Sequence, residues 1–379
     1  GSSTPAGLVE RYRARPKQDW FEESAKQWRQ SLIRFEASCD GWISREVAWN
    51  SYYGQALSSF DAYTGEIFID QGGCYTYDWG LSMAPRDFCQ HALALLPNNP
   101  AQVRGTVRHL TRMCGPDGSL RAAHAGYGRR DIIREQPGDL QLWLLWLIAD
   151  YALFYRDRAF VDQEVPLYPY AAGQKTTIRQ QIRRSLDYLN HIIGRGAHGL
   201  LRLHGGDGNE VLFQGRGRLA SRELRRYGES LLTSGLAGVV LPRVAQLCRW
   251  LGETTWAQEV EQWADDNRQA LAEAWNGHWF DRVLLPKGEP IGRHQLFLDC
   301  QPWIVLAGAA SAEQQAILFQ EIQKRLVDRS PIGPHALDPA VDDHGLPRGN
   351  GMNGGVSFAV NGPLVWALAQ SNPGAAWEM

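Results

Sequence analysis

The most distinctive chemistry in this sequence comes from tryptophan side chains near the ends of predicted helices. The chain of 379 residues contains 15 tryptophans. A flat aromatic face gives a pyranose ring an apolar surface on which to stack, although large aromatic side chains also pack helices together. Trp79, Trp143 and Trp303 are therefore candidate sugar platforms, and each of them, taken singly, is more often a core residue.

Arg86 and Asp87 form a second distinctive pair, at the start of a predicted helix. A guanidinium fork and a carboxylate together match adjacent hydroxyl groups of a sugar ring. The alternative is an ordinary helix start, where the helix dipole favours acidic residues, and the same two interpretations apply to Glu229. Arg129 and Arg130 are candidates to bind an anion or an acidic sugar, or else form a solvated pair in a loop.

The charge and the motifs of the chain exclude several classes of function. A net charge of −2 gives no basic field that would attract nucleic acid or an anionic membrane. We expect an oligosaccharide or glycoside as partner, and neither nucleic acid nor membrane. No phosphate loop follows a predicted strand, no His/Cys cluster has metal-ligand spacing, and no Gly-x-Ser-x-Gly elbow is present, so we expect neither cofactor nor metal. The six cysteines are scattered, which predicts buried thiols.

Segments with helical periodicity recur along the chain and are separated by short turns rich in glycine, proline and asparagine. The predicted helices are 20–37, 85–96, 100–113, 138–155, 177–193, 228–251, 255–275, 301–310, 312–327 and 355–370. Without any alternation of strands and helices, this series predicts an all-α fold, a ring or a solenoid. The contrast between the apolar segment 140–155 and the amphipathic segment 255–275 favours an α/α toroid. Loops at one end of such a ring form the pocket, so loop residues should carry the function.

We expect residues 1–16 to be a polar lead, beginning with Gly1-Ser2-Ser3, which resembles a tag remnant, and residues 17–379 to form a single α/α-barrel catalytic domain. The apolar run 140–154 is too short to span a bilayer and predicts a core helix. The N-terminus lacks the charged and then apolar pattern of a secretory signal, so we expect a cytoplasmic protein.

Several short motifs form an ordered series along the chain, and their order carries more information than any one of them. They are Trp49-Asn50-Ser51-Tyr52-Tyr53, Arg86-Asp87-Phe88-Cys89-Gln90, Asp139-Leu140-Gln141-Leu142-Trp143-Leu144, Gly206-Asp207-Gly208-Asn209-Glu210, Gly228-Glu229-Ser230, Asp299-Cys300-Gln301-Pro302-Trp303 and Asn353-Gly354-Gly355. In this order they resemble the catalytic ring of the cellobiose phosphorylase family, glycoside hydrolase family 94. The resemblance runs from about residue 49 to residue 366, and we expect no counterpart of the β-sandwich that precedes the ring in that family.

The resemblance implies a six-hairpin α/α barrel, an (α/α)6 toroid, that attacks a β-glycoside with inversion. Its motifs, together with the stacking candidate Trp79, give a set of residues expected to bind the sugar: Trp49, Trp79, Arg86, Asp87, Asp139, Trp143, Glu229, Gln301, Trp303 and Asn353.

The turn at residues 206–210 is expected to supply a proton donor. A glycosidic oxygen leaves poorly until it is protonated, so a neutral carboxylic acid must lie beside it. Glu210 occupies the position of the family's acid. Asp207 is the alternative acid, and its other interpretation is a hydrogen-bonding role within the turn. Gly208 replaces the family's tryptophan, and we expect the subsite beside it to be wider.

The nucleophile is where the sequence departs from the phosphorolytic members of the family. Those members have a Thr-His pair, whose histidine contacts phosphate, at the position of Phe358-Ala359. If water attacks instead, inversion needs a carboxylate base about 6.5–9.5 Å from the acid. Asp342 and Asp343 are the candidate bases, with a solvated turn as the alternative. The sequence thus favours hydrolysis, with phosphorolysis or a sugar-binding module without activity as alternatives.

Overall fold

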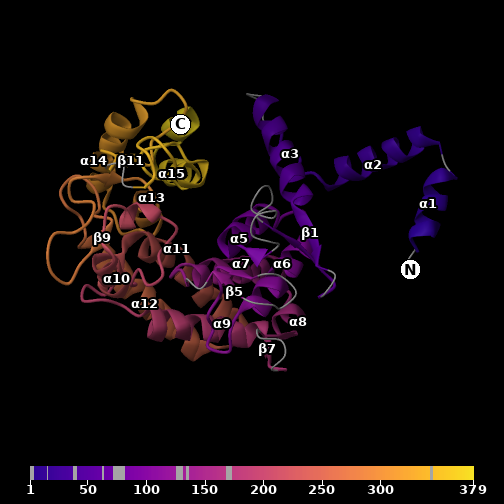
Figure 1. Ribbon diagram of the computed structural model, residues 1–379, viewed down its shortest axis with the longest axis horizontal. Coiled ribbons are helices and arrows are strands. Elements are labelled where there is room, and N and C mark those ends of the chain that lie inside the picture. The colour runs from indigo at the N-terminus through magenta and orange to yellow at the C-terminus, as the bar shows by residue number, and fades with distance from the viewer. Residues whose placement is uncertain are drawn as a thin grey trace.

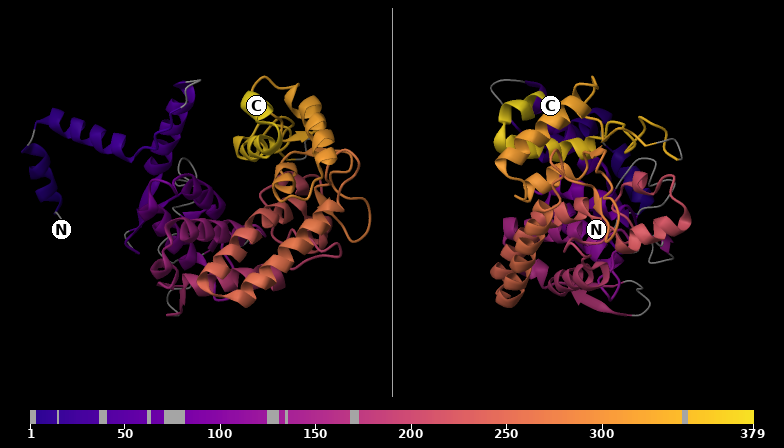
Figure 2. Two further views of the ribbon diagram at one scale, coloured as in Figure 1. Left: turned by 180° about the vertical axis from the view of Figure 1, so that it is seen from behind. Right: turned by 90° about the vertical axis from the view of Figure 1, so that its left-hand side faces the viewer.

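The computed structural model describes residues 4–14, 16–36, 41–61, 64–70, 82–124, 131–133, 136–167, 173–341 and 345–379. In these residues most of the chain is helical, and the helices from α5 to α15 follow one another around an arc (Figures 1 and 2). The predicted all-α (α/α)6 toroid is confirmed.

The inner side of the ring is formed by helices that pack in chain order, each against the next. The most apolar of them is α7, in which 12 of 16 residues are buried because both of its sides are covered. The inner series comprises α3 (Gly41–Ala56), α5 (Pro85–Ala94), α7 (Leu140–Tyr155), α11 (Leu231–Leu251), α13 (Gln301–Leu306) and α15 (Phe358–Ser371).

The outer helices alternate with the inner ones, and all but the last of them bury one face. Two of them begin with a capping box, in which Thr177 and Ser311 each accept a hydrogen bond from a glutamine backbone N–H three residues later. The outer series comprises α6 (Pro100–Met113), α9 (Ile178–Asp187) with the π-helix η2 (Tyr188–Ile193), α12 (Thr254–Ala272), α14 (Ala312–Ile322) with the π-helix η4 (Gln323–Val327), and α16 (Pro373–Glu378).

Short elements complete the chain. The helices α1 (Pro5–Arg13) and α2 (Lys17–Ser31) extend away from the ring (Figure 1), and the others are α8 (Arg158–Val161), η3 (Glu210–Phe213) and α10 (Arg218–Tyr227).

The strands pair antiparallel in small groups: β1 (Ser58–Asp61) with β2 (Glu66–Ile69); β3 (Ser82–Met83), β4 (Ala123–His124) and β5 (Asp131–Ile133); β6 (Glu164–Pro166) with β7 (Lys175–Thr177); β8 (Glu229–Ser230) with β9 (Val283–Leu284); β10 (Leu296–Phe297) with β11 (Leu337–Asp338).

Tryptophan side chains from three inner helices meet at the centre of the ring. Trp143 stacks on Trp146 with ring centroids 5.4 Å apart, and Trp303 meets both rings edge-on. Trp366 of α15 adds a fourth ring, 6.1 Å from Trp146. Because aromatic pairs of this kind contribute about 0.5–1.5 kcal/mol each beyond the area they bury, this cluster ties α7, α13 and α15 together.

Helix α11 is the one helix in the described part of the chain that is long and apolar enough to cross a membrane. Its most apolar stretch is 72% buried inside the ring, which identifies it as a core helix. The shorter apolar helix α7 is buried as the sequence predicted. The cytoplasmic location expected from the sequence stays a prediction.

Five helices of the described part of the chain were absent from the sequence prediction: α1, α3, α8, α10 and α16. Helix α3 carries no regular apolar stripe and buries only Ser51 and Gln55. Helix α10 is rich in arginine and buries only Leu224. Helix α1 forms within the expected polar lead and buries no residue.

Candidate active site

A buried arginine joins two carboxylates at one end of the ring. Arg282, directly before β9, places Nη2 2.8 Å from Oδ2 of Asp207, and its Nε lies 2.9 Å from Oδ1 of Asp299, the residue two before α13. None of the three side chains is more than 4% exposed. Since a buried charge must be compensated by its partners, this triad fixes the positions of three separate segments of the chain relative to each other.

The turn that carries the proposed acid is anchored by this triad. The hydroxyl of Ser230 donates to Oδ2 of Asp207 at 2.5 Å, and Nδ2 of Asn209 donates to Oδ2 of Asp299 at 2.7 Å. Oδ1 of Asp207 is buried and has no hydrogen-bond partner in the described part of the chain. The backbone is therefore fixed up to the residue that precedes Glu210.

The pKa of Asp299 is raised above its ordinary value, so this carboxyl group is protonated more readily than it would be in water. Burial raises the pKa of this carboxyl group, and the nearby Asp207 acts in the same direction. The guanidinium of Arg282 and the amide of Asn209 act in the opposite direction, and the pKa stays above its ordinary value. Asp299 is thus a buried acid that the site can use as a hydrogen-bonding group.

A second arginine lies against this turn and is held in place by a carboxylate. Arg86, near the start of α5, binds Asp139 through Nε (2.6 Å) and Nη2 (2.9 Å), and Nε1 of Trp143 donates to Asp139 at 3.0 Å. Burial alone would lower the pKa of Arg86, but the carboxylates of Asp139, Asp87 and Asp207 raise it above the ordinary value. The guanidinium therefore stays charged and fixed in orientation.

Gly208 lies between Asp207, which is bound by Arg282, and the guanidinium of Arg86. Its φ of +91° lies in the region that favours glycine, and a Cβ here would lie 2.7 Å from Nη1 of Arg86. The sequence predicted that loss of the family's tryptophan would widen this subsite. In the structure the Arg86 guanidinium lies over Gly208, so part of the space is filled by an arginine.

Two adjoining cavities lie on either side of this turn and share Arg86, Asp207, Gly208 and Asn209. The inner cavity, about 220 Å³, lies inside the ring and is also lined by Asp87, Gln90, Asp139, Trp143, Asp299 and Trp303. The outer cavity, about 290 Å³, is also lined by Glu210, Phe213 and Arg225. The two cavities therefore adjoin at this turn.

The structure brings seven of the sequence-predicted site residues to these cavities. Arg86, Asp87, Asp139, Trp143, Asp207 and Trp303 line the inner cavity, and Glu210 lines the outer one. Trp143 and Trp303 are 6% and 7% exposed, with ring centroids 5.8 Å apart. They form the floor of the inner cavity, because most of each ring face is covered by protein.

Three other predicted sugar ligands lie away from both cavities and bond to the backbone. Glu229 is fully buried and accepts hydrogen bonds from the backbone N–H groups of His198 and Leu200. Gln301 accepts from the backbone N–H of Phe280 at 3.0 Å and donates to its carbonyl at 2.8 Å.

The third, Asn353, holds the loop of the candidate bases. It accepts from the backbone N–H of Val341 and donates to the carbonyl of Leu346, each at 2.8 Å. It therefore clamps the two ends of the loop that carries Asp342 and Asp343. Those two residues and Trp79 lie outside the described residues.

Trp49 and Phe358 point away from the site. Trp49 on α3 is 58% exposed and contacts Tyr52. Phe358 is 83% exposed. Its neighbour Ala359 lines the inner cavity together with Ser357, so this segment presents a hydroxyl and a methyl group to the cavity where phosphorolytic relatives are expected to present a histidine.

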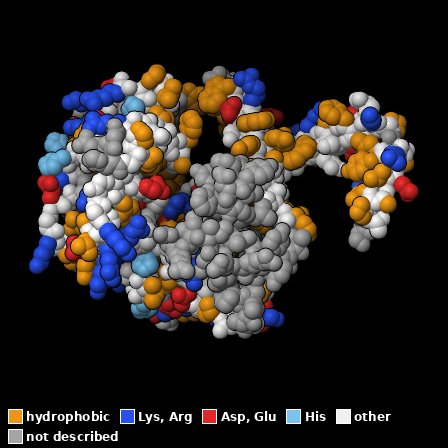
Figure 3. Space-filling model, in the orientation of Figure 1, with side chains coloured by type: hydrophobic (Ala, Val, Ile, Leu, Met, Phe, Trp, Pro, Cys, Tyr) orange, Lys and Arg blue, Asp and Glu red, His pale blue; other side chains and the backbone are white. Residues whose placement is uncertain are grey.

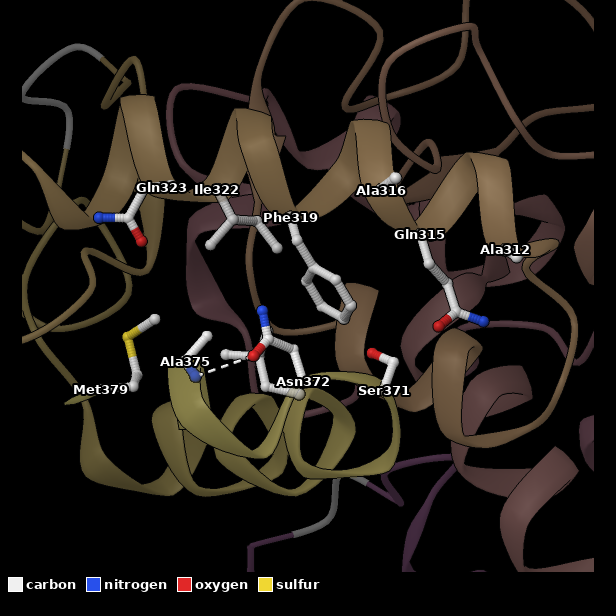
Figure 4. Close-up of a pocket in the computed structure, with 11 residues that line it drawn as sticks. Ala312, Gln315, Ala316, Phe319, Ile322, Gln323, Ser371, Asn372, Ala375 and Met379 are labelled. Atoms are coloured by element: carbon white, nitrogen blue, oxygen red, sulfur yellow. Dashed lines mark hydrogen bonds between the residues drawn. The ribbon is translucent and has the colours of Figure 1, made fainter. Parts of the chain in front are cut away.

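Another cavity, larger than these two at about 390 Å³, lies between α14 and the C-terminal helices (Figure 4). The side chains around it are apolar or uncharged, with Phe319, Asn372 and Met379 among them. It offers no carboxylate for acid–base work. In the described residues no group of three His, Cys, Asp or Glu side chains is arranged to hold a metal ion.

Sequence reasoning did not single out several residues of the site. Asp299 opens a motif whose glutamine and tryptophan were selected in its place, so the signal was present. Arg282 and Arg225 had no signal, since an isolated arginine gives no spacing pattern. Their importance comes from tertiary contacts alone.

A helical ring with a cavity lined by Asp87, Asp139, Asp207 and Asp299 is typical of the six-hairpin class of proteins. Residues 46–356 match the catalytic domain of the glycosyl hydrolase 94 superfamily, and the chain belongs to this family. The family resemblance predicted from the sequence is confirmed.

Among curated relatives, N,N'-diacetylchitobiose phosphorylase from Vibrio proteolyticus is 24% identical over 398 residues, covering 92% of this chain and 45% of that protein. A 3-O-β-D-glucopyranosyl-β-D-glucuronide phosphorylase from Paenibacillus borealis is 29% identical over 211 residues, 53% of this chain and 25% of that protein. Solabiose phosphorylase from the same organism is 27% identical over 213 residues, 54% of this chain and 26% of that protein. The chain thus spans less than half the length of these relatives.

Among solved structures, a mannosylglycerate hydrolase from Thermus thermophilus superposes with a TM-score of 0.56. It is 15% identical, and the match covers 78% of this chain and 82% of that one. At this identity the similarity supports the fold alone.

Proposed function

We propose that this chain cleaves a β-linked glycoside with inversion, and that Glu210 protonates the leaving oxygen. The observation that carries the proposal is the pair of adjoining cavities, which share the turn directly before Glu210. A disaccharide spanning both cavities would place its glycosidic bond beside that turn. Family membership supports the reaction type, and a relative named for a β-D-glucopyranosyl glucuronide supports the linkage.

In this proposal the inner cavity holds the sugar whose bond is cleaved. Its polar wall combines the Arg86 guanidinium with the carboxylates of Asp87 and Asp139, a set that suits adjacent hydroxyl groups. The unpaired Oδ1 of Asp207 adds one acceptor, for which a sugar hydroxyl is the natural donor. Trp143 and Trp303 supply an apolar floor.

Glu210 is the proton donor in this proposal, in preference to Asp207. Asp207 is paired with Arg282 and bonded to Ser230, which commits one of its oxygens to the protein. Glu210 is exposed at the start of η3 and lines the outer cavity, where the leaving group would lie. A sugar bound there would bring its glycosidic oxygen beside this carboxyl group.

The test of this assignment is Glu210→Gln, measured on two kinds of substrate. A β-linked disaccharide needs protonation of its leaving oxygen, so we expect its kcat to fall by about 10²–10⁴-fold, the usual contribution of a general acid. An aryl β-glycoside with a strongly acidic phenol as leaving group needs no such help and should keep most of its rate. Equal loss on both substrates, or no loss on either, would rule Glu210 out as the acid.

Glu223→Gln is the matched control. This glutamate lies on α10, is exposed and lines neither cavity, and its substitution removes the same charge from the same side chain. We expect both substrates to be cleaved at the unaltered rate.

Water and phosphate are both candidates for the nucleophile. The segment 357–360 lines the inner cavity without a cationic side chain, which favours water. The curated relatives named above are all phosphorylases, which favours phosphate. With a β-linked disaccharide, release of free sugar at a rate independent of phosphate would establish hydrolysis, and a sugar 1-phosphate formed only with phosphate would establish phosphorolysis.

If water attacks, Asp342 or Asp343 acts as the base in this proposal. The candidates come from the sequence alone: these are the two carboxylates of the segment that precedes Asn353. We expect one of the variants Asp342→Asn and Asp343→Asn to lose hydrolysis, and azide added as a stronger nucleophile should restore turnover to that variant. Full hydrolysis by both variants would remove the two residues from the mechanism.

A further inference from the structure

An ion pair lies inside the ring, on helices that also reach the inner cavity. Lys and Arg side chains gather on the open surface over α10 (Figure 3), whereas Asp150 and Arg243 belong to the inner helices α7 and α11. Their side chains are 29% and 32% exposed, and Nε of Arg243 lies 3.5 Å from Oδ1 of Asp150. Neither residue lines the inner or the outer cavity, so the proposed reaction gives them no direct role.

Trp146 joins this ion pair to the floor of the inner cavity. It stacks on the floor residue Trp143, with ring centroids 5.4 Å apart and an angle of 17° between the planes. Its indole N–H donates to Oδ2 of Asp150 at 2.7 Å. The guanidinium carbon of Arg243 lies 5.3 Å from its ring centroid. One tryptophan therefore contacts both the cavity floor and both members of the ion pair.

The two stacked tryptophans are bound by acids at opposite ends of α7. Trp143 donates its N–H to Asp139, four residues earlier, and Trp146 donates its N–H to Asp150, four residues later. At 1.5 Å per residue the two acids lie about 16 Å apart along the helix axis. Because an indole whose N–H is bound has one preferred orientation, the two acids together set the tilt of the stack.

Arg243 contacts the same tryptophan cluster from a second helix. Its guanidinium carbon lies 5.9 Å from the ring centroid of Trp366, on α15, and its Nη1 donates to the carbonyl of Val239 at 2.7 Å. Trp303, the other floor residue, meets Trp146 and Trp366 edge-on at 6.0 and 6.3 Å. Since a cation over an aromatic face attracts it, Arg243 draws the tryptophans of α7 and α15 together behind Trp303.

We propose that Asp150 and Arg243 are positioning residues for the sugar in the inner cavity. They set the tilt of Trp146, and Trp146 sets the position of the Trp143 ring against which the sugar lies. The inference rests on the proposed function, since it assigns a sugar to this cavity. A displacement of about 1 Å far from the chemistry can cost as much as about 100-fold in rate. The floor contacts the sugar before and during the reaction, so its displacement should raise KM and leave kcat nearly unchanged.

Variants of Asp150 test this separation of KM from kcat. Asp150→Leu removes the acceptor and the charge together, and with β-linked glucosyl-glucose we expect a KM about 10-fold higher and a kcat within about 2-fold of wild type. Asp150→Asn keeps an acceptor for the N–H of Trp146 and should recover most of the loss. A lower kcat with unchanged KM reports less folded protein and would overturn the proposal, as would equal KM values for the two variants.

Arg243→Met and Arg183→Met form a matched pair of variants. Arg183 is 34% exposed, lies 5.4 Å from the ring centroid of Trp256 and pairs with Asp187 and Glu259, but these partners are on the outer helices α9 and α12. We expect Arg243→Met to raise KM about 5-fold, which corresponds to ~1 kcal/mol, the size of one cation–π contact. Arg183→Met should leave KM unchanged. The same increase in both variants would overturn the assignment of Arg243.

A measurement without ligand separates this inference from the proposed function. Crystal structures of the wild type, Asp150→Leu and Arg243→Met should show the Trp143 ring displaced in the variants by about 0.5 Å or more, the tolerance within which a site must be held. A ring that stays in place in both variants would overturn the inference, even in a protein that cleaves disaccharides. Displacement of the ring in a chain whose wild type cleaves no glycoside would count against the proposed function and still support the positioning of the floor.

Discussion

Replacement of Arg282 by methionine is predicted to be among the most destabilising single changes in the ring. The guanidinium is fully buried and lies 2.8 Å from Asp207 and 2.9 Å from Asp299. Its removal leaves two carboxylates in the interior without a countercharge. Breaking a buried ion pair costs about 3–5 kcal/mol, a large share of the 5–15 kcal/mol by which a typical domain is stable.

Urea unfolding followed by tryptophan fluorescence measures this cost. Arg329→Met is the control, since this arginine is 60% exposed in its pair with Asp338 and should change the free energy of unfolding by less than about 1 kcal/mol. Adding Asp207→Asn and Asp299→Asn to Arg282→Met should recover part of the loss, because neutral amides are cheaper to bury than unpaired carboxylates. A cost below about 1 kcal/mol for Arg282→Met would refute the argument that the triad holds these segments together.

Two other substitutions test the site and the electrostatics of the ring. Gly208→Ala places a Cβ 2.7 Å from Nη1 of Arg86 at a φ of +91°. We therefore expect a free energy of unfolding about 1–3 kcal/mol lower and a kcat/KM at least about tenfold lower. If both quantities keep their wild-type values, the geometry is contradicted. Glu66 tests the pH dependence. Burial alone would raise the pKa of this carboxyl group, but Arg108 and Arg112 hold it below its ordinary value of 4.5. The stability that Glu66 contributes is present above pH 4.5 and is lost as the pH falls through the lowered pKa. Urea titrations between about pH 5 and pH 3 should therefore show a smaller loss for Glu66→Gln than for wild type, and identical slopes would contradict the assignment.

The fold could be predicted because its inner and outer helices differ in pattern. Helix α7 is apolar on all sides and is covered on all sides, and α12 is amphipathic and buries one face. Helix α3 lacks such a stripe, so periodicity could not reveal it. Helix α10 is amphipathic, but it is short, rich in arginine and buries only Leu224, so its apolar face gave too little signal. The prediction worked where burial dictated the residues and missed helices that bury little.

The site could be predicted only as far as its local motifs. Arg86, Asp87, Asp139 and Asp207 belong to short segments with recognisable order, and all line the inner cavity. Arg282 comes from a segment without any motif, although it pairs with two carboxylates of the site.

Some motif residues were selected for chemistry and lie where they stabilise turns. Glu229 and Gln301 satisfy buried backbone groups, which a sequence cannot distinguish from binding a sugar hydroxyl. Both roles require a polar side chain at the end of a helix. Only the direction of the side chain separates them, and that direction is set by tertiary packing.

The anomeric configuration of the first product tests the central claim most directly. Proton NMR within the first minutes of reaction on a β-linked disaccharide, before mutarotation, reports the configuration of the released sugar or sugar 1-phosphate. Inverting cleavage across the two cavities predicts an α-configured product with either nucleophile. A β-configured product would contradict the account.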